Sequence, residues 1–327
     1  MADNLLHDMA RKKAFQPGPL PPREGLGATR ARVPEGPGIR ADDFVWHLVS
    51  TQRHRHPEDD IAAVAARFAE GCVVTRDGSA LSPDAWLVPG TDVYFYRRPA
   101  PEVPVPFEIR PVFEDGDILV VDKPPFLATM PRASHITETA TVRLRRATGN
   151  EELTPAHRLD RATSGLLLLT KRREIRGAYQ ELFARREVRK EYQAIAPLID
   201  VPPAPWRHHL TKAPGEPAAQ VVPGAEPNAF TTLAAVSRLA PFEELELQQR
   251  YDVPAPLARY TLRPKTGRTH QLRVQMMVEA APILGDLIYP VLRPAEDEDF
   301  SRPMQLRCTR LEFTDPLSGA ARSFAVG

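Results

Sequence analysis

The sequence feature that most constrains the fold is an uninterrupted run of leucines over residues 166–169, which directly follows the polar segment 157–165. A short apolar run that begins after a turn sequence, here Thr-Ser-Gly, is typical of a strand buried on both faces. The polar segment carries one acidic residue, Asp160, among basic ones. We therefore expect the carboxylate of Asp160 at the mouth of a core strand, where rigid scaffolds commonly present functional groups.

The surroundings of Asp160 indicate a reactive group. Arg158 and Arg161 lie beside it in the sequence, and nearby cations favour the charged form of a carboxyl group. An ionised and positioned carboxylate can act as a nucleophile or as a base, and the two arginines are suited to bind phosphate. The sequence spacing also allows a second interpretation, in which Asp160 and a neighbouring arginine form a structural salt bridge at the start of the strand.

Residues 157–165, with the sequence HRLDRATSG, resemble the HRLDRxTSG signature of the RluA-type RNA pseudouridine synthases. Three further segments agree with that family in its order along the chain. They are Asp-Lys-Pro at 122–124 after an apolar run, KEYQA at 190–194, which is similar to KxYxA, and GRTHQLR at 267–273, followed by Gly285, Asp286 and Tyr289 as the family's GDxxY. The resemblance covers residues 111–327, and four ordered motifs argue against a merely structural salt bridge at Asp160.

The resemblance implies an enzyme that isomerises specific uridines in structured ribosomal or transfer RNA, with no cofactor and no metal. It also implies three catalytic residues. Asp160 is the carboxylate near the sugar, Arg273 pairs with it, and the ring of Tyr192 packs on the target base with its hydroxyl near carbon 5. Two routes stay open: addition of Asp160 to the sugar, or deprotonation of the sugar to a glycal-like intermediate.

Further residues are expected to contact the RNA substrate. Arg158 matches the family's arginine that fills the gap left by a flipped-out uridine, and such a plug is useful because flipping costs unstacking energy. We assign substrate binding as well to five polar residues of the two longest motifs: Arg161, Thr163, Arg268, His270 and Gln271. Thr269 is expected to cap a helix over residues 269–279, which places Arg273 one turn into that helix.

Charge is balanced over the whole chain but not locally. There are 43 Lys and Arg against 42 Asp and Glu, a formal net charge of +1, whereas residues 143–190 hold thirteen basic and six acidic side chains. A basic face beside the predicted site suits an RNA partner, and the alternative for any single basic pair is a solvated surface.

Two other functional classes compete with an RNA pseudouridine synthase. The chain lacks the PCxxC sequence of the zinc deaminases that act on nucleobases, which removes that class. The more serious alternative is an RNA-binding or ribosome-assembly protein with an idle synthase fold. The presence of Asp160, Tyr192 and Arg273 together argues against it.

Cysteines and hydropathy bear on the location of the protein. Cys72 and Cys308 lie far apart in the sequence, which fits a reducing compartment rather than a disulfide framework. No stretch reaches the roughly 18 apolar residues of a membrane-spanning helix, and the start of the chain lacks the apolar core of a signal peptide. We expect a cytoplasmic, monomeric protein that binds RNA and no membrane.

Proline-rich segments predict the domain boundaries. We expect an extended arm over residues 1–38, a compact module over 39–98, a Pro-rich linker over 99–110 and the catalytic domain over 111–327. The module resembles the small alpha-L RNA-binding unit of many of these synthases. Its second helix, however, carries an excess of acidic side chains, namely Glu58, Asp59, Asp60 and Glu70 against Arg67. RNA binding and a purely scaffolding role are therefore equal alternatives for it.

The remainder of the chain alternates strands and helices without a fixed repeat. We predict helices over 178–186 and 269–279, a long surface loop over 202–227, and strands near 188–196, 230–239, 242–248 and 259–262. This pattern favours the α+β class, with a mixed, largely antiparallel central sheet and flanking helices. The pseudouridine synthase fold, which the resemblance implies, is of this kind.

Overall fold

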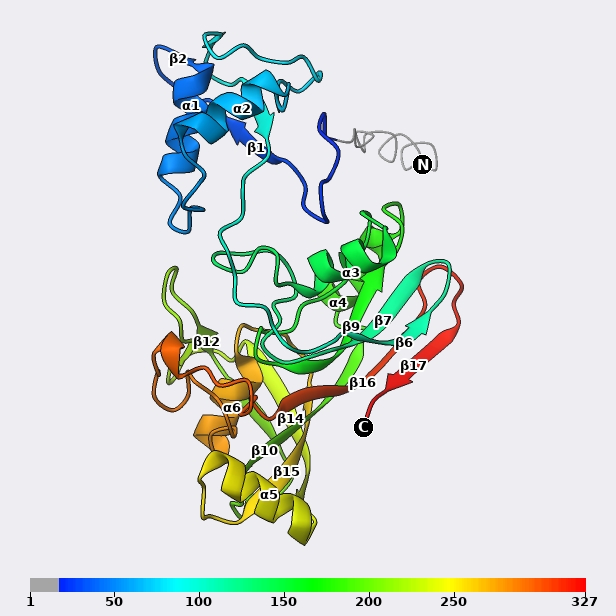
Figure 1. Cartoon of the computed structure of the whole chain (residues 1–327). Coiled ribbons are helices and arrows are strands. Elements are labelled where there is room, and N and C mark those ends of the chain that lie inside the picture. Colours follow the sequence, from blue (N-terminus) through cyan, green and yellow to red (C-terminus); the bar gives the residue numbers. More distant parts are fainter. Residues whose placement is uncertain (1–17) are drawn as a thin grey trace. The chain divides into compact units, whose positions relative to one another are not determined.

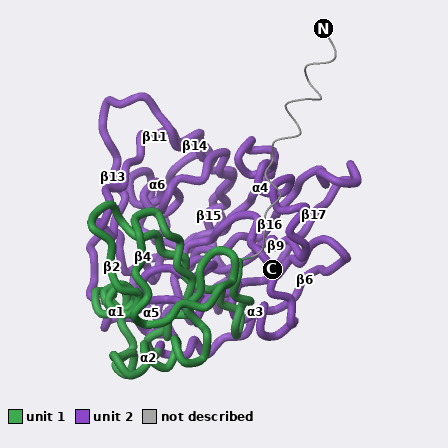
Figure 2. Tube along the Cα trace, turned by 90° about the horizontal axis from the view of Figure 1, so that it is seen from above, with its two compact units in different colours: residues 1–101 green, residues 102–327 purple. Residues whose placement is uncertain are grey.

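The computed structural model describes residues 18–327 (Figure 1). The chain divides into two compact units, residues 1–101 and 102–327, which Figure 2 colours separately. The first part of the expected arm, residues 1–17, lies outside the described residues.

The N-terminal unit packs two helices on a small antiparallel sheet. The helices are α1 (Ala41–Ser50) and α2 (Ile61–Ala69), the sheet has the order β1 (Thr29–Arg32), β5 (Asp92–Phe95) and β3 (Val73–Val74), and β2 (Ile39–Arg40) pairs with β4 (Trp86–Leu87). Asp60 caps α2: its side chain accepts a hydrogen bond from the Ala63 N–H at 2.9 Å. The core of this unit includes Phe44, Val64 and Phe95.

Two predicted boundaries differ from the structure. Residues 29–32, assigned to an extended arm, form β1 and pair with β5 along their whole length. A strand of four residues is too short to show periodicity, and its partner is distant in sequence. At the second boundary, the Glu102 carboxylate accepts a hydrogen bond from the Thr137 N–H at 2.7 Å, and Val105 is buried. The expected linker therefore belongs to the C-terminal unit from Glu102 onward.

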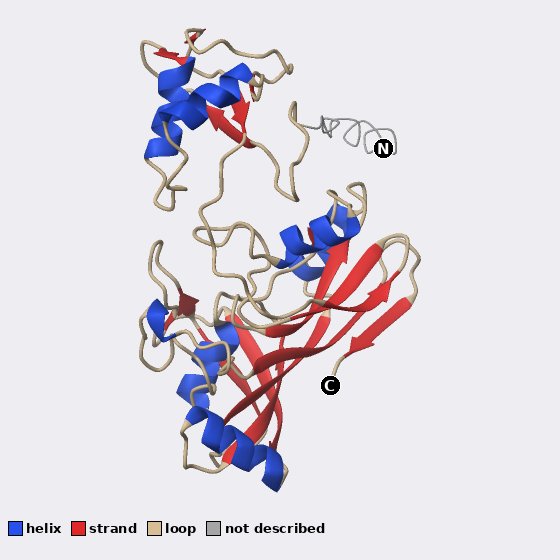
Figure 3. Ribbon diagram, viewed as in Figure 1, coloured by secondary structure: helices blue, strands red, loops and turns tan. Residues whose placement is uncertain are grey.

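The C-terminal unit is built on a ten-stranded sheet (Figure 3). Its main path runs through β11 (Ala204–His208), β14 (Ala229–Arg238), β15 (Leu257–Pro264), β10 (Arg189–Pro197), β16 (Leu306–Thr314), β9 (Ser164–Thr170), β7 (Ile118–Lys123) and β6 (Arg110–Glu114). In addition, β17 (Ala321–Ala325) pairs with β16, and β8 (Thr154–Pro155) pairs with β9. The pairs are antiparallel apart from β9 with β16. The predicted α+β class with a largely antiparallel sheet is confirmed.

Helices and a small ribbon complete this unit. The helices are α3 (Ala140–Thr148), α4 (Arg176–Ala184), α5 (Pro241–Tyr251), α6 (Gln271–Glu279) and the 3-10 helix η2 (Ala295–Asp297). The ribbon pairs β12 (Leu210–Thr211) with β13 (Gln220–Val221). The ribbon and β11 fall within residues 202–227, which we expected to be a loop. Strands of two residues show no periodicity that a sequence could reveal.

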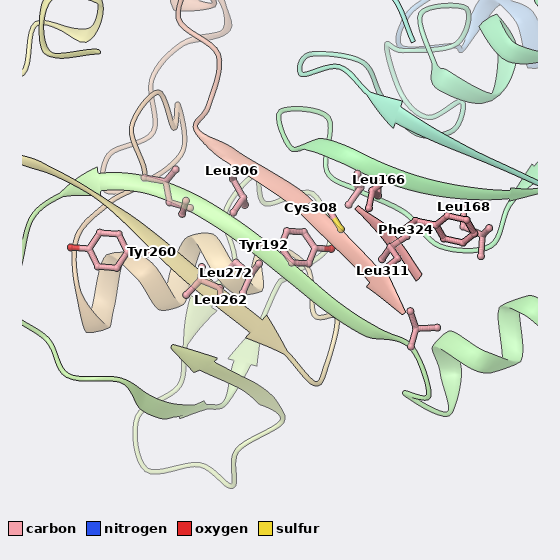
Figure 4. Packing of buried hydrophobic residues seen from close by; sticks show 14 of the residues in the cluster. Leu166, Leu168, Tyr192, Tyr260, Leu262, Leu272, Leu306, Cys308, Leu311 and Phe324 are labelled. Atoms are coloured by element: carbon pink, nitrogen blue, oxygen red, sulfur yellow. The ribbon is translucent and has the colours of Figure 1, made fainter. Parts of the chain in front are cut away.

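Strand β9 confirms the prediction from the leucine run, because all seven of its residues are buried. Since side chains alternate across a strand, Leu166 and Leu168 enter one core while Leu167 and Leu169 enter another. Figure 4 shows part of the first core, where Leu166 and Leu168 lie with side chains of β10, β15, β16 and α6. A strand buried on both faces gives the preceding loop a rigid base.

One predicted strand is wrong: residues 242–248 lie in α5. Pro241 occupies the first helical turn, where its fixed φ is favourable. Glu243 and Glu244 follow in the same turn, where acidic side chains interact favourably with the helix dipole. Phe242 is 80% exposed, so the apolar residues that suggested a strand do not mark a buried sheet face.

Candidate active site

Asp160 lies in the loop between β8 and β9, and two distant side chains fix the backbone on either side of it. The Thr129 hydroxyl donates to the carbonyl of Leu159 at 2.8 Å and accepts from the Leu159 N–H at 3.1 Å. The buried ammonium of Lys123, at the end of β7, donates to the carbonyl of Arg161 at 3.3 Å. The loop is thereby held in place, and the Asp160 side chain remains 27% exposed.

A buried arginine of α6, Arg273, faces Asp160. Its Nη1 lies 3.8 Å from the Oδ2 of Asp160, so the structure brings together the two residues that the sequence analysis paired. The other two nitrogens, Nε and Nη2, donate to the two carboxylate oxygens of Asp286 at 2.7 and 2.5 Å. This two-point contact fixes the plane of the guanidinium and leaves one nitrogen directed at Asp160.

Asp286 is a site residue that the sequence reasoning missed. It appeared there only as part of the GDxxY motif, and the structure makes it the main partner of Arg273. Burial lowers the pKa of Arg273, but the hydrogen bonds and negative charge of Asp286, together with the charge of Asp160, outweigh this effect and raise the pKa overall. Arg273 therefore keeps its positive charge beside Asp160.

The two arginines that flank Asp160 in the sequence do not pair with it. Arg161 is held by Glu298, with Nη2 2.7 Å from Oε1. Arg158 is exposed, and no described residue forms an ion pair with it. The backbone bends at this point, where the Thr163 N–H donates to the Asp160 carbonyl at 3.1 Å, so nearness in sequence does not place the side chains of residues 158 and 161 against the Asp160 carboxylate. The cation beside Asp160 is Arg273.

Tyr192 enters the site from β10 and is 8% exposed. Figure 4 shows its hydroxyl directed toward the sulfur of Cys308 on the neighbouring strand β16, with which it is in register. Burial raises the pKa of Tyr192 well above its usual value, and Cys308 and Asp160 add to the effect. The phenol therefore stays protonated near Asp160 and can donate a proton or a hydrogen bond.

The start of α6 differs from the prediction. Thr269 does not cap the helix: His270 occupies the N-cap position with a φ of 57°, and the helix begins at Gln271. A left-handed backbone at a residue other than glycine is strained and is often found at functional sites. The Nδ1 of His270 lies 3.1 Å from the hydroxyl of Tyr289, and burial lowers the pKa of His270.

Two residues that we assigned to RNA binding lie inside the fold. Gln271 is 4% exposed, and its Oε1 accepts a hydrogen bond from the Thr266 hydroxyl at 2.8 Å. Thr163 is 3% exposed, and its N–H donates to the carbonyl of Asp160 at 3.1 Å. Both therefore support the backbone of the site. Arg268, in contrast, is exposed.

The chemistry available is that of a carboxylate beside a buried cation, with a protonated phenol nearby. Such a set can supply an anionic nucleophile or base and a proton donor. Within residues 18–327, no group of three or more His, Cys, Asp or Glu side chains is arranged to hold a metal ion. Nor does that part of the chain contain a helix long and apolar enough to cross a membrane.

The fold and the site together define the class of protein. Human RNA Pseudouridylate Synthase Domain Containing 1 has a similar fold, with a TM-score of 0.53 at 24% sequence identity, over 67% of this chain and 83% of that one. The family model described as RNA pseudouridylate synthase matches residues 117–277, a range that contains Asp160, Tyr192 and Arg273. The class is that of the pseudouridine synthases.

Two curated relatives identify the family within this class. The chain is 30% identical over 214 residues to the dual-specificity RNA pseudouridine synthase RluA of Haemophilus influenzae, across 65% of this chain and 90% of that protein. It is 28% identical over 272 residues to the ribosomal large subunit pseudouridine synthase D of Neisseria meningitidis serogroup A, across 78% of this chain and 68% of that protein. The chain belongs to the RluA-type RNA pseudouridine synthase family and is an isomerase that acts on RNA.

Proposed function

We propose that this synthase isomerises specific uridines in a structured ribosomal or transfer RNA, with Asp160 as the group that reacts at the ribose and without a cofactor. The observation that carries the proposal is which groups surround the Asp160 carboxylate. It faces the buried charge of Arg273 at 3.8 Å, and no described residue donates a hydrogen bond to it. The protein supplies its counter-charge while the carboxylate oxygens remain available to a substrate.

The reaction needs a carboxylate in this state. Pseudouridine formation breaks the bond between N1 and C1′ of a uridine, joins C1′ to carbon 5 of the same ring, and releases the proton from carbon 5. Asp160 can act as a nucleophile at C1′ or as a base at C2′, and in both routes it starts ionised. Because Asp286 already holds the guanidinium of Arg273, the positive charge beside Asp160 needs little reorganisation during the step.

Two further residues take roles at the substrate in this proposal. Tyr192 retains its proton close to Asp160, which suits a contact with the base and proton transfer at carbon 5. Arg158 is exposed and has no ion pair with a described residue, which suits a side chain that fills the gap left by a flipped uridine. We propose Arg268 and His270 as additional RNA contacts.

The test is the release of tritium from RNA labelled at carbon 5 of uridine. Asp160→Asn should abolish release, because a neutral amide neither attacks the sugar nor takes its proton, and RNA affinity should stay within about threefold of wild type. The matched control is Asp117→Asn, which removes a carboxylate paired with Arg172 just before β7, at the opposite end of that strand from Lys123. Turnover of the Asp160 variant within about tenfold of wild type would contradict the assigned role.

The RNA target calls for a separate measurement. Of the two relatives, one is named for the large ribosomal subunit and the other as a dual-specificity enzyme. The first name supports ribosomal RNA as a substrate class, and we propose transfer RNA as the other candidate. Pseudouridines mapped in cells that lack this gene, with and without a restored active copy, would identify the uridine. If the pseudouridines that disappear from these cells lie only outside ribosomal and transfer RNA, the proposed substrate class is wrong.

A further inference from the structure

Tyr289 lies behind the site and makes two separate sets of contacts, one through its hydroxyl and one through its ring. The side chain is buried, with 4% exposed. Its hydroxyl accepts a hydrogen bond from the Ala219 N–H at 2.7 Å and lies 3.1 Å from the Ala219 carbonyl oxygen. The same hydroxyl lies 3.1 Å from Nδ1 of His270. The hydroxyl thus joins Ala219, just before β13, to the start of α6.

The ring of Tyr289 faces the guanidinium of Arg273, whose central carbon lies 5.3 Å from the ring centroid. The face of an aromatic ring carries negative electrostatic potential, and it attracts a cation at this distance. One edge of the guanidinium is bound by Asp286. Bound by Asp286 and lying over the Tyr289 ring, the group has little freedom left, and Nη1 is the nitrogen that faces Asp160.

The ribbon of β12 and β13 is small and needs support from outside its own two strands. Each of its strands has only two residues, and such a short ladder is not stable by itself in water. Ala219, at the base of β13, is buried together with Leu210, Val274 and Tyr289 in a small cluster of its own. The hydrogen bonds of the Tyr289 hydroxyl therefore tie the ribbon to the wall of the site at β13, while the Asn228 side chain, bonded to both backbone groups of Leu210, holds it at β12.

We propose that Tyr289 is a positioning residue with two separable actions. Its ring holds Arg273 in the orientation that supports Asp160, and its hydroxyl fastens the β12–β13 ribbon to α6. The first action rests on the proposed role of Asp160 and deepens it. The second does not depend on that role, because it concerns only the stability of the ribbon.

The two actions are separated by two replacements in the full chain. Tyr289→Phe keeps the ring and removes the hydroxyl, so the rate of a single turnover at saturating RNA should stay within about threefold of wild type. Replacing Tyr289 by pentafluorophenylalanine keeps the shape but takes the negative potential from the ring face, and the same rate should fall by about tenfold or more. RNA affinity should change by less than about threefold in both proteins. An effect on affinity alone would point to a structural role.

Tyr260 provides the matched control, since its hydroxyl also bonds two backbone groups: it accepts from the Ile199 N–H at 3.0 Å and donates to the Pro197 carbonyl at 2.7 Å. The same two replacements at Tyr260 should leave the single-turnover rate unchanged. If Tyr289→Phe slows turnover as much as the fluorinated replacement does, or if the fluorinated replacement has no effect, the ring does not position Arg273.

Amide hydrogen exchange tests the second action without any turnover. Tyr289→Phe should speed exchange over residues 210–221 by about tenfold or more, because the ribbon opens more often once its fastening is lost. Tyr260→Phe should leave that segment unchanged. Equal exchange in the Tyr289 variant and wild type would refute the fastening. If wild type released no tritium, the proposed function would fail, while this measurement would still decide the role of the hydroxyl.

Discussion

At the scale of single residues, the guanidinium of Arg273 is the centre of the site's electrostatics. Asp286 binds two of its nitrogens, and the third faces Asp160. The side chains of Arg273 and Asp286 are 5% and 0% exposed, so water cannot replace a lost partner for either charge. Asp286 therefore holds Arg273 in place as the counter-charge of Asp160.

Asp286→Asn should lower the free energy of unfolding by about 3 kcal/mol, because it leaves a buried guanidinium without a charged partner. It should also slow tritium release, because the guanidinium is then less firmly oriented. Urea unfolding and single-turnover rates measure the two effects. Asp299→Asn is the control, since it breaks a surface pair with Arg302 and should cost less than about 1 kcal/mol. If Asp286→Asn lowers the free energy of unfolding no more than Asp299→Asn does, Asp286 does not stabilise the buried charge of Arg273.

At the scale of elements, the parallel pairing of β9 with β16 connects the two halves of the site. Gly165 of β9 is in register with Cys308 of β16, and Cys308 is in register with Tyr192 of β10. The backbones of β9 and β16 approach so closely that a Cβ on Gly165 would lie 2.2 Å from the Cys308 carbonyl oxygen, and the φ of Gly165 is +105°. This contact sets the distance between the loop of Asp160 and the strand of Tyr192.

Gly165→Ala should lower the free energy of unfolding by about 3 kcal/mol or more, through backbone strain and the clash with Cys308. It should reduce activity as well, because β9 and β16 must move apart. The matched control is Gly177→Ala in α4, where a Cβ meets nothing within 4 Å and the better helix propensity of alanine should add up to about 1 kcal/mol. Thermal and urea unfolding of both variants measure the contrast. If Gly165→Ala and Gly177→Ala have equal stability, the close contact between β9 and β16 does not require a glycine at residue 165.

At the scale of the whole molecule, the open question is how far the N-terminal unit contributes to RNA binding. Its described part, residues 18–101, holds ten arginines and no lysine against eleven acidic side chains, and several of the arginines contact those acids. Arg30 and Arg32 lie 2.8 and 3.0 Å from the carboxylate of Asp92, and Arg67 lies 2.7 Å from that of Asp59. A guanidinium with an internal carboxylate partner gains less from a phosphate, so this unit should contribute little to salt-dependent affinity.

Removing residues 1–101 should change the slope of log affinity against log salt by about one unit or less, since each phosphate contact is worth roughly one unit. For comparison, the double variant Arg186→Gln with Arg189→Gln removes two exposed arginines of the basic segment 143–190 and should lower the slope by about two. Affinity measured over a range of salt concentrations decides between these outcomes. A loss of about three units or more on truncation would show that the N-terminal unit binds RNA directly.

The amino-acid sequence by itself determined the features that depend on local pattern. The leucine run predicted a strand covered on both sides, and β9 is buried throughout. The longer elements α4, β10, β14 and β15 lie close to their predicted positions, because elements of this length show their periodicity. Asp160 and Arg273 were paired from their motifs, and they lie 3.8 Å apart.

Only the tertiary structure decided which distant groups meet. It showed that Arg273 makes its two-point contact with Asp286, that Arg161 pairs with Glu298, and that the Tyr289 hydroxyl contacts Ala219. It also made β1 part of a sheet and turned residues 242–248 into a helix. The physical reason is that periodicity reports which face of an element is buried. The partner of a buried polar group depends instead on how distant segments close around it, and a sequence read locally carries no record of that closure.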